Sequence, residues 1–225
     1  MRTYFKIIKY IQETLLVIAI LIMAVFPSLI VFNKDIITNE VSSNLYLVSH
    51  IFLFFVMIIR PLADIFTKTI WIRPLVILRK GTGVMSASIV VSFILAKLMI
   101  DPGSYFASIA TLKYWSMVNY AVLAHMADIS AVILIITSNN FSKRILGDYW
   151  KNIQKLSYIY FYGSVFYVFL SYGSVYLALA LIIVTTFTFV AFIVNKKRKL
   201  AQVPINILVE NKINIINKLY DYKKI

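Results

Sequence analysis

Six apolar segments, each about long enough to cross a lipid bilayer, constrain the fold of this chain most strongly. A spanning helix needs about 20 mainly apolar residues, because the hydrocarbon core is about 30 Å thick. The segments are residues 11–32, 45–65, 83–100, 117–137, 156–169 and 174–194. Only a short turn, residues 171–173, follows the fifth segment, which predicts a tight hairpin between the fifth and sixth helices. The sequence therefore predicts an all-α, polytopic membrane protein with a six-helix transmembrane bundle.

Composition leaves little room for anything besides this bundle. Hydrophobic residues make up 61% of the 225 and charged residues 14%, whereas soluble domains run nearer 45–50% and 25%. The longest polar block is a tail of about 30 residues, so no second globular domain is expected. The chain divides into a cytoplasmic N-terminus (1–10), a transmembrane domain (11–194) and a basic cytoplasmic tail (195–225).

The positions of the lysines and arginines predict the orientation of the bundle. With the N-terminus inside, 20 of the 23 Lys and Arg residues fall on the cytoplasmic side. The outer loops hold only Lys34 and Lys113, and Lys97 lies within the third segment. Cytoplasmic loops of bacterial membrane proteins carry such an excess. We therefore expect a multi-pass protein of the bacterial inner membrane with both termini cytoplasmic.

The net charge of +14 also raises the question of whether the chain binds nucleic acid. The basic residues stand in short runs between apolar segments, and no basic face with interleaved aromatics appears outside those segments. This distribution is typical of topology determinants and contact with anionic lipid, so the expected partner is the bilayer and not nucleic acid.

The basic tail begins with the cluster Lys196–Lys199, which is typical of a stop to membrane insertion. Beyond Pro204, apolar residues recur at helical spacing with polar residues between them. This pattern predicts an amphipathic helix lying on the inner membrane surface. A helix that docks on a partner protein is the alternative.

Few residues in the chain are suited to soluble-enzyme or metal chemistry. Cysteine is absent, and there are two histidines and nine carboxylates. No phosphate-binding loop, Gly-x-Ser-x-Gly elbow or His-Glu-x-x-His motif occurs in the sequence. The sequence thus names no catalytic residue and no metal site.

Four ionisable residues inside the predicted membrane segments are the candidate functional residues: His50, Lys97, His125 and Asp128. Charged groups in a bilayer cost several kcal/mol unless they are paired, which makes them functional candidates. His125 and Asp128 share one helix face, because they stand three residues apart. We expect Asp128 to pair with Lys97 or His125, and the cluster is a candidate for ligand binding or proton movement.

The same four residues also have a purely structural interpretation. Lys97 is near enough to the outer surface to extend to the headgroups, and each histidine can be neutral and bonded to a neighbouring helix. His50 and His125 could alternatively ligate a haem between the second and fourth helices, one imidazole on each side.

Several connection motifs resemble the ferric reductase-like transmembrane domain family over about residues 40–195. The closest group is MsrQ/YedZ, the haem-carrying membrane subunit of the periplasmic methionine sulfoxide reductase system. The matching motifs are Arg60-Pro61-Leu62-Ala63, Arg79-Lys80-x-x-Gly83, Thr137-Ser138, Lys143-Arg144-Ile145-Leu146-Gly147 and Trp150-Lys151-x-Ile153-Gln154-Lys155-Leu156-x-Tyr158. They are similar to the family's Thr-Pro-Leu-Ala, Arg-Arg-x-Leu-Gly, Thr-Ser, Arg-Arg-Leu-Gly and Trp-Lys-x-Leu-His-x-Leu-x-Tyr segments.

The resemblance implies a six-helix bundle that carries electrons through haem to a periplasmic redox protein. The chain departs from the family at the haem-ligand histidines, because those positions are Phe93, Gln154 and Tyr167. Phe has no lone pair, Gln is a poor iron ligand, and Tyr favours ferric high-spin haem.

Three hypotheses for the function follow. The first is a divergent electron-transfer subunit with degenerate haem sites, which would make the chain part of a membrane oxidoreductase. The second is a haem-free membrane anchor or assembly partner without redox activity. The third is a small transporter that uses Lys97, His125 and Asp128.

Overall fold

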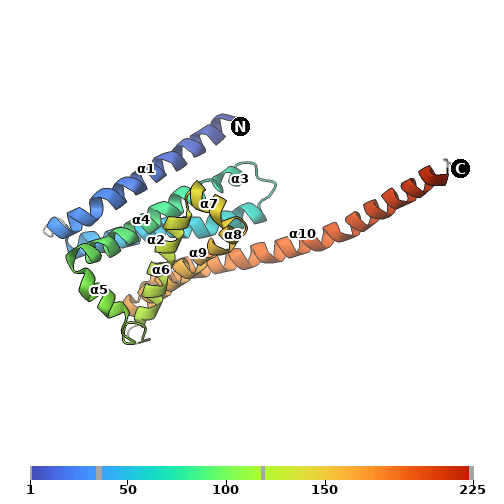
Figure 1. The fold of residues 1–225 in the computed structure, drawn as a ribbon. Helices are drawn as coiled ribbons and strands as arrows, with labels where there is room; N and C mark the ends of the chain where they lie inside the picture. The colour runs from blue at the N-terminus through green and yellow to red at the C-terminus, as the bar shows by residue number, and fades with distance from the viewer. Residues whose placement is uncertain (1, 34–36, 118–119, 223–225) are drawn as a thin grey trace.

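The computed structural model describes the backbone of residues 2–33, 37–117 and 120–222, and side chains as far as residue 200, except those of residues 2 and 199. Within these ranges the chain is helical and has no strand. The helices are α1 (Arg2–Phe32), α2 (Asn39–Ile65), α3 (Ile72–Leu75), α4 (Leu78–Ile100), α5 (Pro102–Ile109), α6 (Ala121–Thr137), α7 (Asn140–Leu146), α8 (Tyr149–Ile153), α9 (Leu156–Tyr172) and α10 (Val175–Tyr222) (Figure 1).

Four helical segments are long and apolar enough to cross a membrane: Thr3–Phe32, Asn39–Ile65, Ile72–Ile100 and Val175–Arg198. A fifth is added if α6 and α7, which meet at 95°, form one broken span. The prediction of an all-α chain with several candidate spans is therefore confirmed. The count of six is not, because α9 has 17 residues and rises only about 26 Å, less than the ~30 Å hydrocarbon core.

Helix α4 lies at the centre of the bundle. It packs against α1 on one side and against α2 and α6 on the others, while α9 packs on both α6 and α2 (Figure 1). Helix α10 packs on α2 and α9. Large apolar side chains remain exposed along α1 and α10, as expected for helices whose outer faces contact lipid tails and not water.

The core is built where α2, α4, α6 and α9 meet. Its buried members include Leu53, Phe161, Val165 and Ala131. Gly163 on α9 allows a close approach to α6, since a Cβ at this position would lie 2.9 Å from the carbonyl oxygen of Leu123. Small residues at helix interfaces permit this kind of contact in membranes.

The helix ends follow local sequence rules. Side chains of Thr38, Asp101 and Asn139 cap α2, α5 and α7 by accepting hydrogen bonds from backbone N–H groups of the first turn. Gly173, with φ at +64°, ends α9 in the left-handed conformation that glycine adopts without strain. The predicted hairpin between α9 and α10 is thus present, and it turns at residues 173–174.

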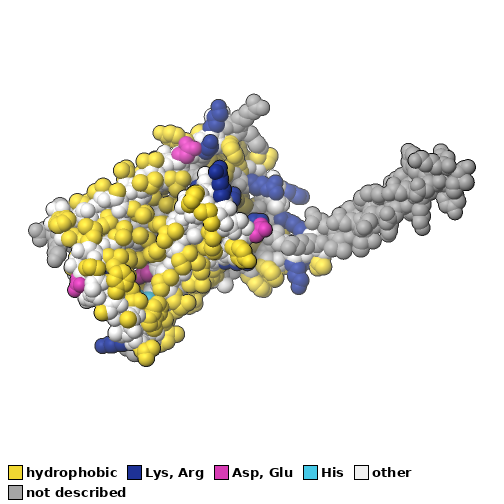
Figure 2. All heavy atoms as spheres, in the orientation of Figure 1, with side chains coloured by type: hydrophobic (Ala, Val, Ile, Leu, Met, Phe, Trp, Pro, Cys, Tyr) yellow, Lys and Arg dark blue, Asp and Glu magenta, His cyan; other side chains and the backbone are white. Residues whose placement is uncertain are grey.

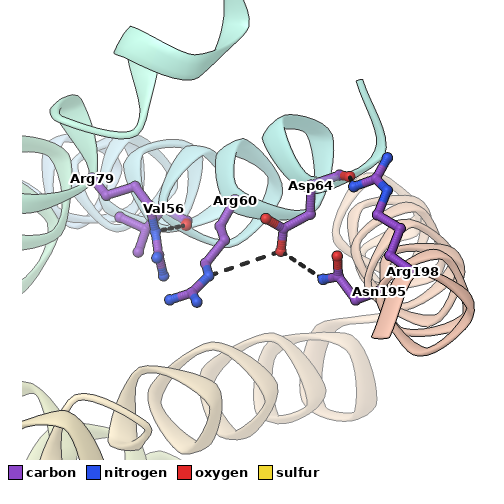
Figure 3. A network of polar contacts seen from close by, with 6 residues as sticks. All are labelled: Val56, Arg60, Asp64, Arg79, Asn195 and Arg198. Atoms are coloured by element: carbon purple, nitrogen blue, oxygen red, sulfur yellow. Dashed lines mark hydrogen bonds and ion pairs between the residues drawn. The ribbon is translucent and has the colours of Figure 1, made fainter. Parts of the chain in front are cut away.

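Helix α10 is held to the end of α2 by polar contacts (Figure 3). Arg198 donates hydrogen bonds to the backbone oxygen of Asp64 at 2.6 Å and to Oγ1 of Thr67 at 3.1 Å. Asn195 Nδ2 donates to Asp64 Oδ2 at 3.1 Å. The helix continues to Tyr222, but the predicted amphipathic face beyond Pro204 lies outside the described side chains.

Charged side chains are unevenly distributed over the bundle. Figure 2 shows most of the visible lysines and arginines at the end of the bundle where α3, α7 and α8 lie, and an apolar surface over much of the remainder. At the opposite end, around α5 and the start of α6, few basic residues are visible.

Candidate functional site

The predicted polar cluster lies at the end of the bundle that carries few cations. His125 and Asp128, on the first turns of α6, line a small cavity of about 140 Å³ together with Tyr105, Tyr114 and Trp115. The sequence prediction that His125 and Asp128 share a face agrees with this shared cavity. Lys97, in the last turn of α4, is near enough for its charge to act on both.

Aromatic rings hold His125 in place. Its imidazole stacks on Tyr114, with ring centroids 3.5 Å apart and an angle of 12° between planes. Trp115 meets it edge-on at 6.3 Å, and the indole N–H of Trp115 is fixed by the carbonyl oxygen of Ile109 at 2.9 Å. Burial, together with the nearby Tyr105, raises the pKa of Tyr114 to about 12, and burial also raises the pKa of Tyr105. Both phenols therefore keep their protons at neutral pH.

Asp128 has no ion-pair partner in the described part of the chain. The ion pairs found there within 4.0 Å are Lys9–Glu13 and Arg60–Asp64. The expected pairing of Asp128 with Lys97 or His125 is thus not seen as a direct contact.

His50 lies in different surroundings, between α2 and α9. Its Nδ1 is 2.7 Å from the carbonyl oxygen of Tyr46, one turn earlier, so Nδ1 carries a proton and donates it. The Nε2 atom is buried without a hydrogen-bond partner, and the nearest polar group on α9 is the backbone of Ser164. Tyr46 itself stacks on Phe93 at 4.6 Å.

The haem site expected between His50 and His125 has no counterpart in the two cavities described here. Of the small cavity and the larger one described below, His125 lines the first and His50 lines neither. The two histidines therefore share neither of these cavities.

The three positions that correspond to the family's histidines have different contacts. Phe93 packs on Tyr46, Tyr167 lies near Tyr172 at the α9–α10 turn, and Gln154 lines the other cavity, at the start of α9. Among the described residues, no group of three or more His, Asp or Glu side chains is close enough to hold a metal ion.

The larger cavity, about 380 Å³, lies at the basic end of the bundle between α2, α4, α6 and the short helices α7 and α8. Five cations line it, and none of its described lining residues is acidic. The five cations are Arg60, Arg79, Lys80, Lys143 and Lys151. We refer to this space as the basic cavity.

A buried hydroxyl cluster lies beside the basic cavity. The Tyr160 hydroxyl on α9 is 3.0 Å from Ser86 Oγ on α4 and 3.3 Å from Ser49 Oγ on α2. Ser49 also donates to the carbonyl oxygen of Ser86 at 3.0 Å. Three helices are thereby joined by polar groups that would otherwise be costly to bury, and Tyr160 forms part of the cavity wall.

Sequence reasoning identified every cation of the basic cavity, but as topology determinants. Arg60 lies near the end of the second predicted segment and the Arg79–Lys80 pair in the connection that follows, whereas Lys143 and Lys151 stand over 50 residues further along, between the fourth and fifth segments. Both connections were predicted to lie on one side of the membrane, which could have suggested that they meet. The α7–α8 segment that brings them together was not predicted.

The fold and the two cavities define a class, a helical bundle with candidate membrane spans and a basic cavity at one end. Comparison of the chain with protein-family models, curated proteins and solved structures finds no match.

Proposed function

We propose that the chain is a haem-free, multi-pass protein of the bacterial inner membrane whose bundle serves as a membrane anchor or assembly partner. The observation that carries this proposal is that His50 lines neither the basic cavity nor the small cavity that His125 borders. The motif resemblance to the ferric reductase-like family supports a divergent member that keeps the bundle without the haem ligands.

The proposed topology has six spans and both termini in the cytoplasm. In addition to the candidate spans, α9 would cross a locally thin region as the fifth helix, paired with α10 through the Gly173 turn. The gathering of cations at the end that holds α3, α7 and α8 supports a cytoplasmic placement of that end (Figure 2).

The absence of cysteine from the chain gives a clean test of this topology. Single cysteines would replace Lys113 before α6 and Lys68 between α2 and α3, both exposed. A membrane-impermeant maleimide added to intact spheroplasts should label Lys113→Cys at once, and Lys68→Cys only after permeabilisation. The reverse pattern would contradict the orientation.

Absorption spectroscopy tests the haem-free assignment. The protein purified in detergent from haem-supplemented cells should show no band in the usual haem region, roughly 410–430 nm. A stoichiometric band that disappears in His50→Ala or His125→Ala would overturn the proposal and favour an electron-transfer subunit acting on a periplasmic redox protein. His125→Ala and His50→Ala serve as controls for each other, because they lie in separate surroundings.

A small transporter is the second candidate, favoured by the shared cavity of His125 and Asp128 with Lys97 nearby. Proteoliposomes with an imposed pH gradient test it. Proton uptake that is lost in Asp128→Asn would support transport, and equal leak in wild type, variant and empty vesicles would exclude proton movement through this cluster.

A further inference from the structure

We propose that the basic cavity binds the phosphate headgroup of an anionic lipid, with the lipid's apolar chain against the aliphatic wall of the same cavity. The inference stands independently of whether the bundle holds haem. It rests on the charge, the hydrogen-bonding capacity and the lining of this one space.

Charge is the first argument. The four cations Arg79, Lys80, Lys143 and Lys151 have no carboxylate within 4.0 Å in the described part of the chain. Arg60 lies at the limit of an ion pair, with Nε 4.0 Å from Asp64 Oδ2. Like charges that converge on a concave wall repel one another, and a bound anion relieves that repulsion.

Unused donors are the second argument. Arg79 Nε donates to the carbonyl oxygen of Val56 at 2.9 Å, which anchors the side chain and leaves its two terminal nitrogens for a ligand. Arg60 and Arg79 extend to the same side of α2 (Figure 3). Gln154 lines the cavity too, and its amide Nε2 is buried without a partner. Planar guanidinium groups match phosphate oxygens in pairs, and a phosphate oxygen would also satisfy the amide.

The third argument distinguishes a lipid from a free ion. The cavity holds about 380 Å³, far more than a single phosphate group, which is about as large as a few waters. Leu53, Val56 and Leu134 form an apolar wall inside the ring of cations. Basic pockets between transmembrane helices on the cytoplasmic side are typical sites for lipid headgroups.

Trp150 provides a local reporter for binding. Its ring lines the cavity, with Lys143 Nζ 5.3 Å from the ring centroid, and its indole N–H is held by the carbonyl oxygen of Thr137 at 2.9 Å. Replacing Trp71 and Trp115 by phenylalanine leaves Trp150 as the single tryptophan of the chain.

The experiment titrates this single-tryptophan protein, in detergent micelles, with dioctanoyl phosphatidic acid while Trp150 fluorescence is recorded. Dioctanoylglycerol, which lacks the phosphate, is the matched lipid control. Glycerol 3-phosphate and inorganic phosphate are the soluble arms. We expect a saturable change with phosphatidic acid, and neither diacylglycerol nor the soluble phosphates should match its affinity.

Two double variants distinguish binding in the cavity from general electrostatic attraction to the micelle surface. Lys80→Gln/Lys151→Gln removes two exposed cavity cations and should weaken phosphatidic acid binding roughly tenfold for each cation that contacts the phosphate. Lys68→Gln/Lys155→Gln removes the same charge from the same end outside the cavity and should bind as the parent does. Arg79→Lys keeps the charge, loses the planar fork and should weaken binding even though folding is preserved.

Three results would overturn the proposal. The first is the absence of a saturable response to phosphatidic acid, or an equal response to dioctanoylglycerol. The second is equal binding by the two lysine double variants. The third is glycerol 3-phosphate binding as tightly as phosphatidic acid, which would replace the lipid by a soluble phosphate ester.

Discussion

The two ends of the bundle contain cavities of opposite character. The basic cavity is the larger, has five cations and no acidic lining residue among those described, and is formed by α2, α4, α6 and α9 together with the short helices α7 and α8. The small cavity around His125 and Asp128 holds about 140 Å³, contains a carboxylate, and is lined by aromatic rings of which Tyr114 stacks on His125. One bundle thus has a cationic cavity at one end and, at the other, a smaller cavity with a carboxylate and room for several waters.

The difference shows how one set of helices can support two kinds of site. At the basic end α6 bends sharply into α7, at 95°, so α7 and α8 lie across the helix ends and leave space between them. Near the start of α6, Gly163 lets α9 approach the α6 backbone closely, and the small cavity lies on another side of α6, towards α4 and α5.

The largest expected effect distinguishes the walls of the two cavities. Tyr160 is only 3% exposed and joins three helices, so Tyr160→Ala should lower the free energy of unfolding by about 3–5 kcal/mol. Tyr114→Ala, on a partly exposed ring in a connection, should cost about 1 kcal/mol. Denaturant unfolding in detergent micelles, followed by circular dichroism, measures both; similar losses would show that the two walls are equally structural.

A second prediction concerns the unequal closeness of packing. At Gly163 a Cβ would meet the Leu123 carbonyl oxygen at 2.9 Å, whereas at Gly83, on the basic cavity, it would meet Val56 Cγ2 at an ordinary 3.5 Å. Gly163→Ala should therefore destabilise the protein by about 1–3 kcal/mol through overpacking. Gly83→Ala should be neutral or slightly stabilising, because alanine favours helix. Equal melting temperatures for the two variants would refute the packing difference.

These contrasts also show what the sequence could and could not reveal. Apolar segment length predicted most helix positions, because the bilayer imposes a length of about 20 residues. The fourth segment begins at Ala121 and not at residue 117, since Tyr120 adopts a positive φ that interrupts the helix. The α9–α10 turn was predictable because Gly173 lies between two apolar runs.

Side-chain neighbours were much less predictable. His125 and Asp128 share a cavity because spacing of three places residues on one helix face. The distance between His50 and His125 depends on how α2, α4, α6 and α9 pack, and helical periodicity carries no information about that. The stacking of Tyr114 on His125 likewise arises from a connection whose path no local pattern specifies.

A third prediction compares the carboxylates near the two ends. Asp128 borders an apolar cavity without an ion pair in the described structure, so Asp128→Asn should raise the free energy of unfolding by about 1 kcal/mol through relief of desolvation. Asp64 accepts a hydrogen bond from Asn195 and lies 4.0 Å from Arg60, so Asp64→Asn should lower it by about 0.5 kcal/mol. Unfolding curves measured in parallel check both variants. Free energies of unfolding that change in the same direction would contradict the predicted difference between Asp128 and Asp64.

The smallest expected effect is a pH dependence confined to the aromatic wall of the small cavity. Burial raises the pKa of Tyr114 to about 12, from 10 in the unfolded chain, so the folded state holds the phenolic proton more tightly. The stabilisation is fully present below pH 10 and is lost as the pH rises toward 12. Tyr114→Phe has no proton to lose, so its melting temperature should fall less than that of the wild type between pH 9 and 11. Below pH 9 the difference between the two proteins should stay constant, and a parallel fall above pH 9 would mean that Tyr114 titrates alike in the folded and unfolded chains.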